Sequence, residues 1–364
     1  MNSAIRIGIL LTAAILTGCS AEETAPGHRQ ESRQAIAFAT TGCRPTRKAL
    51  GTLTLDGAGT GEVSLRTTGF GVFACHTGLH PYVSSDITAN YMWNQNVTYD
   101  TTDGIWDYTP LIYWPNAVDG LYPYVSFFAY APYAANPGTG ATAADRCVVD
   151  MSRSVESGDP WLVYQLGGSV DDWQDHQVDL LYDFKPDQQE GNVPDRVNFQ
   201  FRHALAQAGD QITVTCSPEL QLRLLQAYTG TPVSIILDRV ELVYTLLRKG
   251  RLRLNGTAAP LWETIASESP TVRRRLILEP EGGHVLCTAT SSSDCDVTDY
   301  TATDKGIFYI PLNVEGCTQQ VDIYVSYHTS KNNPGALTTR IDLTDVTEAG
   351  SNRSFRIVMP EIPI

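Results

Sequence analysis

Hydrophobic and polar residues alternate along most of the chain from residue 35 onward. Residues 197–201 (VNFQF) and 321–327 (VDIYVSY) are clear examples, with an apolar side chain at every second position. Because successive side chains of a β-strand point to opposite faces, this period of two predicts antiparallel strands with one buried face. The connections are rich in Gly, Asn, Asp and Pro, which are typical of turns. The pattern therefore predicts an all-β protein.

The runs that predict strands are residues 50–55, 70–75, 95–99, 106–108, 125–131, 161–166, 197–201, 211–216, 233–243, 251–254, 272–278, 307–311, 321–327 and 355–359. Helical periodicity is scarce. Residues 218–228 (PELQLRLLQAY) give the best helix, and residues 179–182 are predicted as one helical turn. Short strands at regular spacing favour antiparallel β-sandwiches over alternating strand–helix units.

A chain of 364 residues is long for one domain, so two domains are expected. Residues 183–195 (DFKPDQQEGNVPD) are polar, contain two prolines and separate two β-rich halves, as a domain boundary does. We therefore expect an N-terminal β-sandwich domain over residues 35–190 and a C-terminal one over residues 191–364.

The chain begins with a targeting segment over residues 1–18. Arg6 is followed by an apolar stretch over residues 7–16, which is too short to span a bilayer. The segment ends in residues 16–19 (LTGC), which resemble a bacterial lipobox. That resemblance implies that Cys19 is lipidated and becomes the mature N-terminus. The alternative is an ordinary secretory signal peptide followed by a chance cysteine.

The residues after Cys19 are polar and rich in Glu, Gln and Arg. Residues 20–23 (SAEE) are similar to the acidic export signal of surface lipoproteins in the Bacteroidetes. Residues 19–34 are expected to form a tether between the lipid and the folded body.

Charge and cysteine content narrow the function further. The net charge of -14 argues against nucleic-acid binding, which needs clustered Lys and Arg. The chain has eight cysteines, and lipidation of Cys19 leaves an odd number at wide spacings, which is not a disulfide framework. Cys287 and Cys295 flank a Ser/Thr-rich loop. The sequence leaves open whether these two bridge a hairpin or are free cysteines in strands.

Residues 35–40 (AIAFAT) predict one strand with Ile36 and Phe38 on its apolar face. A polar, basic stretch that contains Arg44 and Arg47 follows at once. Farther along, residues 91–133 are dense in aromatic side chains. These rings could fill the space between packed sheets or form a stacking platform for a sugar, and the alternation favours packing.

A series of short pieces occurs in one order over some 300 residues behind the lipobox. The pieces are residues 70–74 (FGVFA), 106–110 (WDYTP), 113–115 (YWP), 125–133 (VSFFAYAPY), 179–182 (DLLY), 197–206 (VNFQFRHALA), 307–312 (IFYIPL) and 321–327 (VDIYVSY). Taken together, the chain resembles the Bacteroidetes fimbrillin family, which includes the Mfa-like and major-fimbrillin lipoproteins.

The resemblance implies two transthyretin-like antiparallel β-sandwich domains in tandem, in a cell-surface pilus subunit or related adhesin. In that family a protease cuts after an arginine beyond the first strand, and a strand from the next subunit fills the opened groove. Ile36 and Phe38 would then be the pocket-filling pair of the removable strand. Arg47 is the favoured processing site, with Arg44 as the second candidate. The alternative is that residues 35–40 are a permanent first strand that is never cut.

The sequence shows no Gly-x-Ser-x-Gly elbow, no Walker motif and no dinucleotide fingerprint. We predict no enzymatic activity, catalytic residue, metal site or cofactor. The expected partners are other fimbrial subunits, the outer membrane through the lipid anchor, and a host or microbial surface ligand, with no nucleic acid. The alternative function is a monomeric surface lipoprotein that binds glycan through exposed aromatics such as Trp93 or Trp173.

Overall fold

The computed structural model describes residues 34–41, 52–58, 62–84, 87–167, 177–193, 195–266, 269–312, 318–331, 333–343, 349–360 and 362. Of the described residues, 50% lie in strands and 7% in helices, so the chain is mostly β, as the all-β prediction required. By its contacts, Gln34–Ile364 groups as one compact unit. Within the described ranges, no helix is long and apolar enough to cross a membrane.

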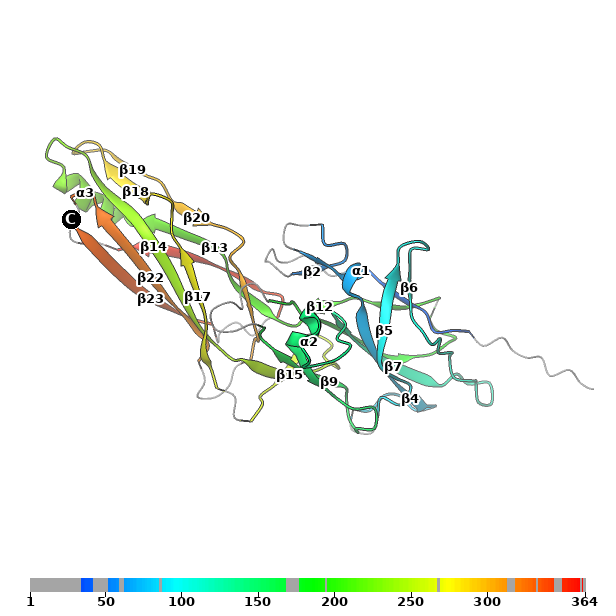
Figure 1. Cartoon of the computed structure of the whole chain (residues 1–364). Helices are drawn as coiled ribbons and strands as arrows, with labels where there is room; N and C mark the ends of the chain where they lie inside the picture. The colour runs from blue at the N-terminus through cyan, green and yellow to red at the C-terminus, as the bar shows by residue number, and fades with distance from the viewer. Residues whose placement is uncertain are drawn as a thin grey trace, which may run out of the picture. The chain divides into compact units, whose positions relative to one another are not determined.

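The largest sheet has eight strands in the order β11-β1-β6-β5-β4-β7-β10-β12 (Figure 1). Their bounds are β1 (Phe38–Thr40), β4 (Phe70–Gly78), β5 (Met92–Asp100), β6 (Ile105–Asp107), β7 (Tyr124–Ala131), β10 (Leu181–Gln188), β11 (Val197–Phe199) and β12 (Arg202–His203). All of these neighbours pair antiparallel except β1 and β11, which are parallel.

The centre of this sheet is covered on both faces. Along β7, Phe127 and Ala129 belong to one hydrophobic cluster, whereas Phe128 and Tyr130 belong to the other. All four side chains are fully buried. A strand that is buried on both faces has no polar face, which explains why β7 reads as a continuous apolar run rather than an alternating one.

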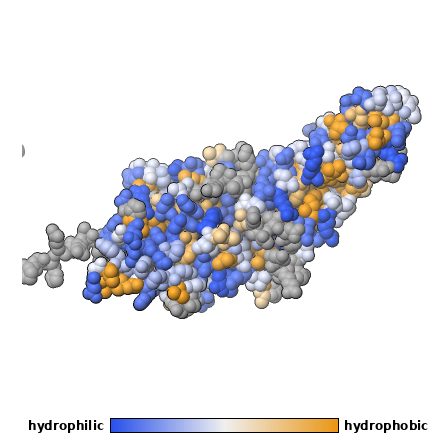
Figure 2. Space-filling view, turned by 180° about the vertical axis from the view of Figure 1, so that it is seen from behind, coloured by the Kyte–Doolittle hydropathy of each residue, from blue (hydrophilic) through white to orange (hydrophobic). Residues whose placement is uncertain are grey.

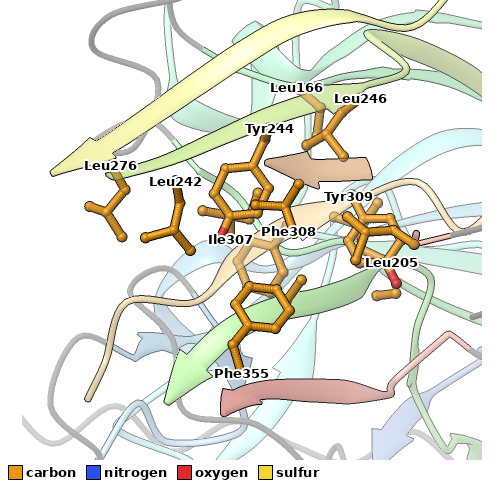
Figure 3. Packing of buried hydrophobic residues seen from close by; sticks show 14 of the residues in the cluster. Leu166, Leu205, Leu242, Tyr244, Leu246, Leu276, Ile307, Phe308, Tyr309 and Phe355 are labelled. Atoms are coloured by element: carbon orange, nitrogen blue, oxygen red, sulfur yellow. The ribbon is translucent and has the colours of Figure 1, made fainter. Parts of the chain in front are cut away.

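The later part of the chain forms two further sheets. One joins β13 (Ala206–Cys216), β20 (Tyr300–Ala302), β21 (Ile307–Tyr309) and β24 (Asn352–Met359). The other joins β14 (Val233–Leu246), β17 (Thr271–Leu278), β18 (His284–Ala289), β19 (Cys295–Val297), β22 (Gln320–Thr329) and β23 (Pro334–Asp342). Figure 3 shows side chains from both sheets, including Tyr244, Phe308 and Phe355, pointing toward one another in a shared core.

Two smaller sheets complete the strands. One consists of β8 (Val148–Met151), β9 (Trp161–Gln165), β15 (Lys249–Arg253) and β16 (Leu261–Glu263), and the other of β2 (Leu53–Thr54) and β3 (Val63–Ser64). The helices are α1 (Leu65–Thr68), α2 (Ala143–Cys147) and α3 (Pro218–Ala227).

Helix α3 confirms the helix predicted over residues 218–228. The Ser217 side chain accepts a hydrogen bond from the Leu220 backbone N–H at 3.1 Å, and Pro218 occupies the first turn. Both features are typical of helix starts. Leu220 and Leu224 lie four residues apart and are fully buried, so this face of the helix packs into the core.

The helical turn predicted over residues 179–182 was wrong. Leu181 and Tyr182 begin strand β10 and pair with β7 and β12. Leu180 and Leu181 are both fully buried, in different hydrophobic clusters. Two adjacent leucines can point to opposite faces of a sheet that is covered on both sides, so their adjacency does not indicate a helix.

The eight-stranded sheet contains strands from both sides of the domain boundary expected after residue 190. Strands β11 and β12 follow that residue, yet they pair with β1 and β10 of the first sheet. In addition, β9 pairs with β15 across the expected boundary. The boundary between two domains therefore stays a prediction.

Candidate functional site

Strand β1 lies between β11 and β6, and we call its position in the sheet the β1 slot. Phe38 pairs with Val197 of β11 in a parallel register and with Trp106 of β6 in an antiparallel one. The Val197 N–H donates to the Ala37 carbonyl at 2.8 Å, and the Thr41 N–H donates to the Phe199 carbonyl at 3.2 Å. Removing β1 would leave backbone groups of both neighbouring strands unpaired.

The segment before β1 is also paired. The Ile36 N–H donates to the Ile112 carbonyl at 2.9 Å, and the Trp114 N–H donates to the Gln34 carbonyl at 3.0 Å. An isolated antiparallel bridge joins Ala35 to Tyr113. The ladder of the β1 slot therefore extends over residues 34–41.

Ile36 and Phe38 point into the core, as predicted from the alternation. Ile36 is 1% exposed and Phe38 is 0% exposed. Four rings surround the Phe38 ring at centroid distances of 5.4 Å (Tyr108), 5.7 Å (Phe199), 5.8 Å (Phe127) and 6.3 Å (Phe70). Aromatic pairs at these distances contribute beyond simple burial. Both side chains therefore fill buried apolar positions of the β1 slot.

Tyr108 contacts the β1 slot through its hydroxyl. Its Oη lies 2.9 Å from the Ile36 carbonyl oxygen and 3.1 Å from the Ile112 carbonyl oxygen, and it accepts from the Ile112 N–H at 3.3 Å. One hydroxyl therefore joins the segment before β1 to the loop that pairs with it. Burial raises the pKa of Tyr108 to about 12, so the phenol stays protonated and able to donate at neutral pH.

The described chain resumes at residue 52, where a second set of contacts holds it to the same sheet. Asp179 Oδ2 accepts from the Leu53 N–H at 3.2 Å and lies 2.6 Å from His203 Nδ1. Asp179 is fully buried and His203 is 6% exposed. His203 thus makes a buried structural hydrogen bond. Residues 34–41 and the chain from Leu53 onward are held by different partners.

The structure corrects the candidate disulfide. Cys287 bonds to Cys216 at the end of β13, whereas Cys295 is a free, partly exposed cysteine. In the β18–β19 hairpin, Cys287 lies opposite Val297 and Cys295 opposite Ala289. The two cysteines are therefore offset by two residues and do not face each other. The observed disulfide instead joins two different sheets.

Of the thirteen aromatic side chains in residues 91–133, six are buried, four are partly buried and three are exposed, so the set mainly packs the core, as the alternation favoured. Trp106, Tyr108 and Trp114 are at most 8% exposed. Trp93 differs, because 47% of it is exposed and its indole Nε1 donates to the Ser152 carbonyl at 2.8 Å. The ring of Trp93 is therefore exposed to solvent but held in one orientation.

Several predicted residues lie outside the described residues: Cys19, Arg44, Arg47 and Trp173. In the part of the chain that is described, no group of three or more His, Cys, Asp or Glu side chains is placed to hold a metal ion.

Figure 2 shows one face of the molecule, on which hydrophobic residues lie in separate groups among hydrophilic ones.

Two parts of the site were not predicted from the sequence. Parallel pairing of β1 with β11 joins residues that are about 160 positions apart, and neither strand carries a signal for its partner. The roles of Tyr108 and Asp179 were also missed. A polar residue at the edge of an apolar run, as Asp179 is before Leu180, was the available signal for a buried hydrogen-bonding group.

Residues 66–225 match the fimbrillin-like family. Among curated proteins, the chain is 24% identical over 306 residues to the fimbrium subunit Fim1C of Phocaeicola vulgatus, covering 79% of this chain and 73% of that protein.

Solved structures show weaker likenesses. A proposed cell adhesion protein from Bacteroides eggerthii has a TM-score of 0.38 and 12% identity, over 91% of this chain and 92% of that one. A proposed cell adhesion protein from Bacteroides uniformis has a TM-score of 0.35 and 10% identity, over 85% and 84%. Both scores are below 0.5, so these likenesses carry no conclusion about fold or function.

Proposed function

From the match of residues 66–225 to the fimbrillin-like family, we propose that the chain is a cell-surface fimbrial subunit or related adhesin that assembles by β-strand addition. Proteins of this family are structural and are not enzymes. The expected partners are other fimbrial subunits, and the expected location is the fimbrium at the cell surface.

One observation carries the mechanism: the first described strand of the chain fills an inner position of its sheet. β1 pairs on both sides, and its buried side chains pack against rings from the other strands. If this strand is removed, an incoming strand can regain the ladder hydrogen bonds and fill the apolar positions, which are the two contributions that drive β-strand addition.

The contacts on either side of residues 42–51 support processing in that stretch. Residues 34–41 are held by β11, β6 and the loop near Tyr108, whereas Leu53 is held by Asp179. A cut after Arg47, or after Arg44, would separate β1 from the rest of the chain without breaking any of the contacts described for Leu53. The chain after the cut would keep its place while the β1 slot became open to exchange.

The test is the N-terminus of the protein isolated from the cells that produce it. Processing after Arg47 gives a chain that starts at Lys48, and a gel of surface material then shows a ladder of polymers. Arg47→Ala should abolish both the processing and the polymer ladder, whereas the matched control Arg44→Ala should keep them. If Arg44→Ala abolishes processing and Arg47→Ala does not, the site is Arg44. An unprocessed, monomeric protein at the surface would refute assembly after cleavage.

We also propose that the chain reaches the outer membrane as a lipoprotein acylated at Cys19. The support is the lipobox-like stretch over residues 16–19 and the apolar segment that precedes it. Metabolic labelling with a palmitate analogue should label the precursor, and Cys19→Ser should remove the label. A precursor that is exported with no label would show an ordinary secretory signal peptide instead.

For the domain organisation, we propose two transthyretin-like β-sandwiches in tandem. One hydrophobic cluster is formed only by residues between Ile36 and Phe201, and the six-stranded sheet only by residues after 232. Because β11 and β12 pair with the first sheet, we propose that these two strands belong to the N-terminal domain although they follow residue 190, and that the β9–β15 pair links the two domains. Limited proteolysis should leave a stable fragment that includes β12, and a stable fragment ending near 190 would contradict this.

A second candidate function is glycan binding by a monomeric lipoprotein, which the fixed and exposed ring of Trp93 favours. An indole face held in one orientation can stack on a sugar ring at low entropic cost. Trp93→Ala should then weaken binding on a glycan array at unchanged stability. An array on which no glycan binds the wild-type chain would exclude this candidate.

A further inference from the structure

We propose that the β1 slot selects its strand by one aromatic side chain, so that a partner strand must present an aromatic residue at the position of Phe38. The inference rests on the proposed function, because it takes β1 to be replaced by the strand of another subunit. The proposed function does not say which strands the β1 slot accepts, and the aromatic position specifies their chemistry.

The selective element is the set of rings around Phe38. Phe70, Tyr108, Phe127 and Phe199 come from four separate segments of the chain, in or next to β4, β6, β7 and β11. Phe70 and Phe127 meet the Phe38 ring edge-on, at interplanar angles of 78° and 82°. Phe199 stacks on it at 26°.

Edge-on and stacked contacts depend on the quadrupole and the flat shape of a ring. A leucine side chain at the same position would fill part of the volume but could make neither contact well. Alanine would leave a void among the buried rings that surround the Phe38 position. The pocket therefore distinguishes an aromatic residue from other apolar residues, rather than accepting any hydrophobic side chain.

The backbone contacts of the slot are independent of the partner's sequence, but they set its register. Tyr108 Oη contacts the carbonyl two residues before Phe38, and the Val197 N–H donates to the carbonyl one residue before it. Any extended strand could make these hydrogen bonds. Only one register places them together with an aromatic side chain in the pocket, because a shift by one residue turns that side chain to the other face.

The partner strand is thus an extended segment with an aromatic residue in the Phe38 position and an apolar residue two positions earlier, where Ile36 is buried. Replacing the aromatic residue by alanine should weaken binding roughly 100-fold or more, by analogy with buried Phe→Ala changes. Replacement by leucine should cost about tenfold, which is the scale of the aromatic contribution.

The experiment keeps the full chain and changes only the incoming strand. A site-specific protease sequence replaces residues 43–49, so that cleavage leaves β1 held without a covalent link. Fluorescent peptides with the sequence of residues 34–41 (QAIAFATT) then compete for the slot. The competitors are the parent peptide, the Phe38→Leu and Phe38→Ala peptides, and Ala39→Ser as the matched control on the other face of the strand.

The expected result is binding of the parent and Ala39→Ser peptides with similar affinity, about tenfold weaker binding of Phe38→Leu and at least 100-fold weaker binding of Phe38→Ala. Equal affinity of the Phe and Leu peptides would overturn the aromatic selection while leaving strand exchange intact. If no peptide displaces β1 from the cleaved protein under any condition that keeps it folded, the proposed assembly mechanism fails and this inference fails with it.

Discussion

Phe38→Ala tests how strongly the first strand is held by its packing. The side chain is fully buried, so the loss of its transfer free energy costs about 2–3 kcal/mol. Four rings line the space that it would leave, and the void together with the lost ring contacts adds about 1–2 kcal/mol. We therefore expect the free energy of unfolding to fall by about 4 kcal/mol.

Urea denaturation followed by tyrosine and tryptophan fluorescence measures this change, and hydrogen exchange locates it. Amide protons of β1, β6 and β11 should exchange faster in the variant, because their ladder depends on the strand that Phe38 anchors. Leu222→Ala is the matched control. Leu222 is 58% exposed on α3, so its truncation should change the free energy of unfolding by less than about 0.5 kcal/mol.

A loss below about 1 kcal/mol for Phe38→Ala, with unchanged exchange in β6 and β11, would refute the reasoning. Such a result would mean that the ring cluster keeps its structure without the Phe38 ring. The packing of β1 would then contribute little, and neither the tight filling of the slot nor its selectivity for an aromatic residue would stand.

Three further predictions concern other parts of the structure. Asp179→Asn should lower the free energy of unfolding by up to about 3 kcal/mol, because an amide replaces the buried carboxylate that contacts His203 and the Leu53 N–H. Urea denaturation measures the change, and an unchanged value would contradict the buried contact. Cys216→Ser should lower the free energy of unfolding by up to about 4 kcal/mol, because the cross-link between residues 71 positions apart restricts the unfolded chain. Peptide mapping of the wild-type chain should recover Cys216 linked to Cys287, and linkage of Cys287 to another cysteine would refute the pairing. The free energy of unfolding should fall as the pH rises from about 10 toward about 12, because the pKa of the Tyr108 phenol is near 10 in the unfolded chain and about 12 in the folded one. Urea denaturation at several pH values should show a shallower fall for Tyr108→Phe than for the wild-type chain. An equal fall would show that Tyr108 does not contribute.

The strands whose one face is buried were the easiest to predict. Residues 321–327 alternate along their whole length, and β22 covers them within Gln320–Thr329. Strand β23 was missed because its residues are largely exposed and carry no apolar face. The hydrophobic pattern reports burial, so a strand that buries little leaves no trace in it.

The amino-acid pattern by itself determined the mostly-β class, the α3 helix and the inward direction of Ile36 and Phe38, because these depend on the order of side chains within one short segment. Only the tertiary structure decided that β1 lies between β11 and β6, that Cys287 bonds to Cys216, and that Asp179 holds both Leu53 and His203. Each of these joins segments that are distant in the chain. Their pairing is set by the register and packing of the whole sheet, which no local stretch of residues encodes.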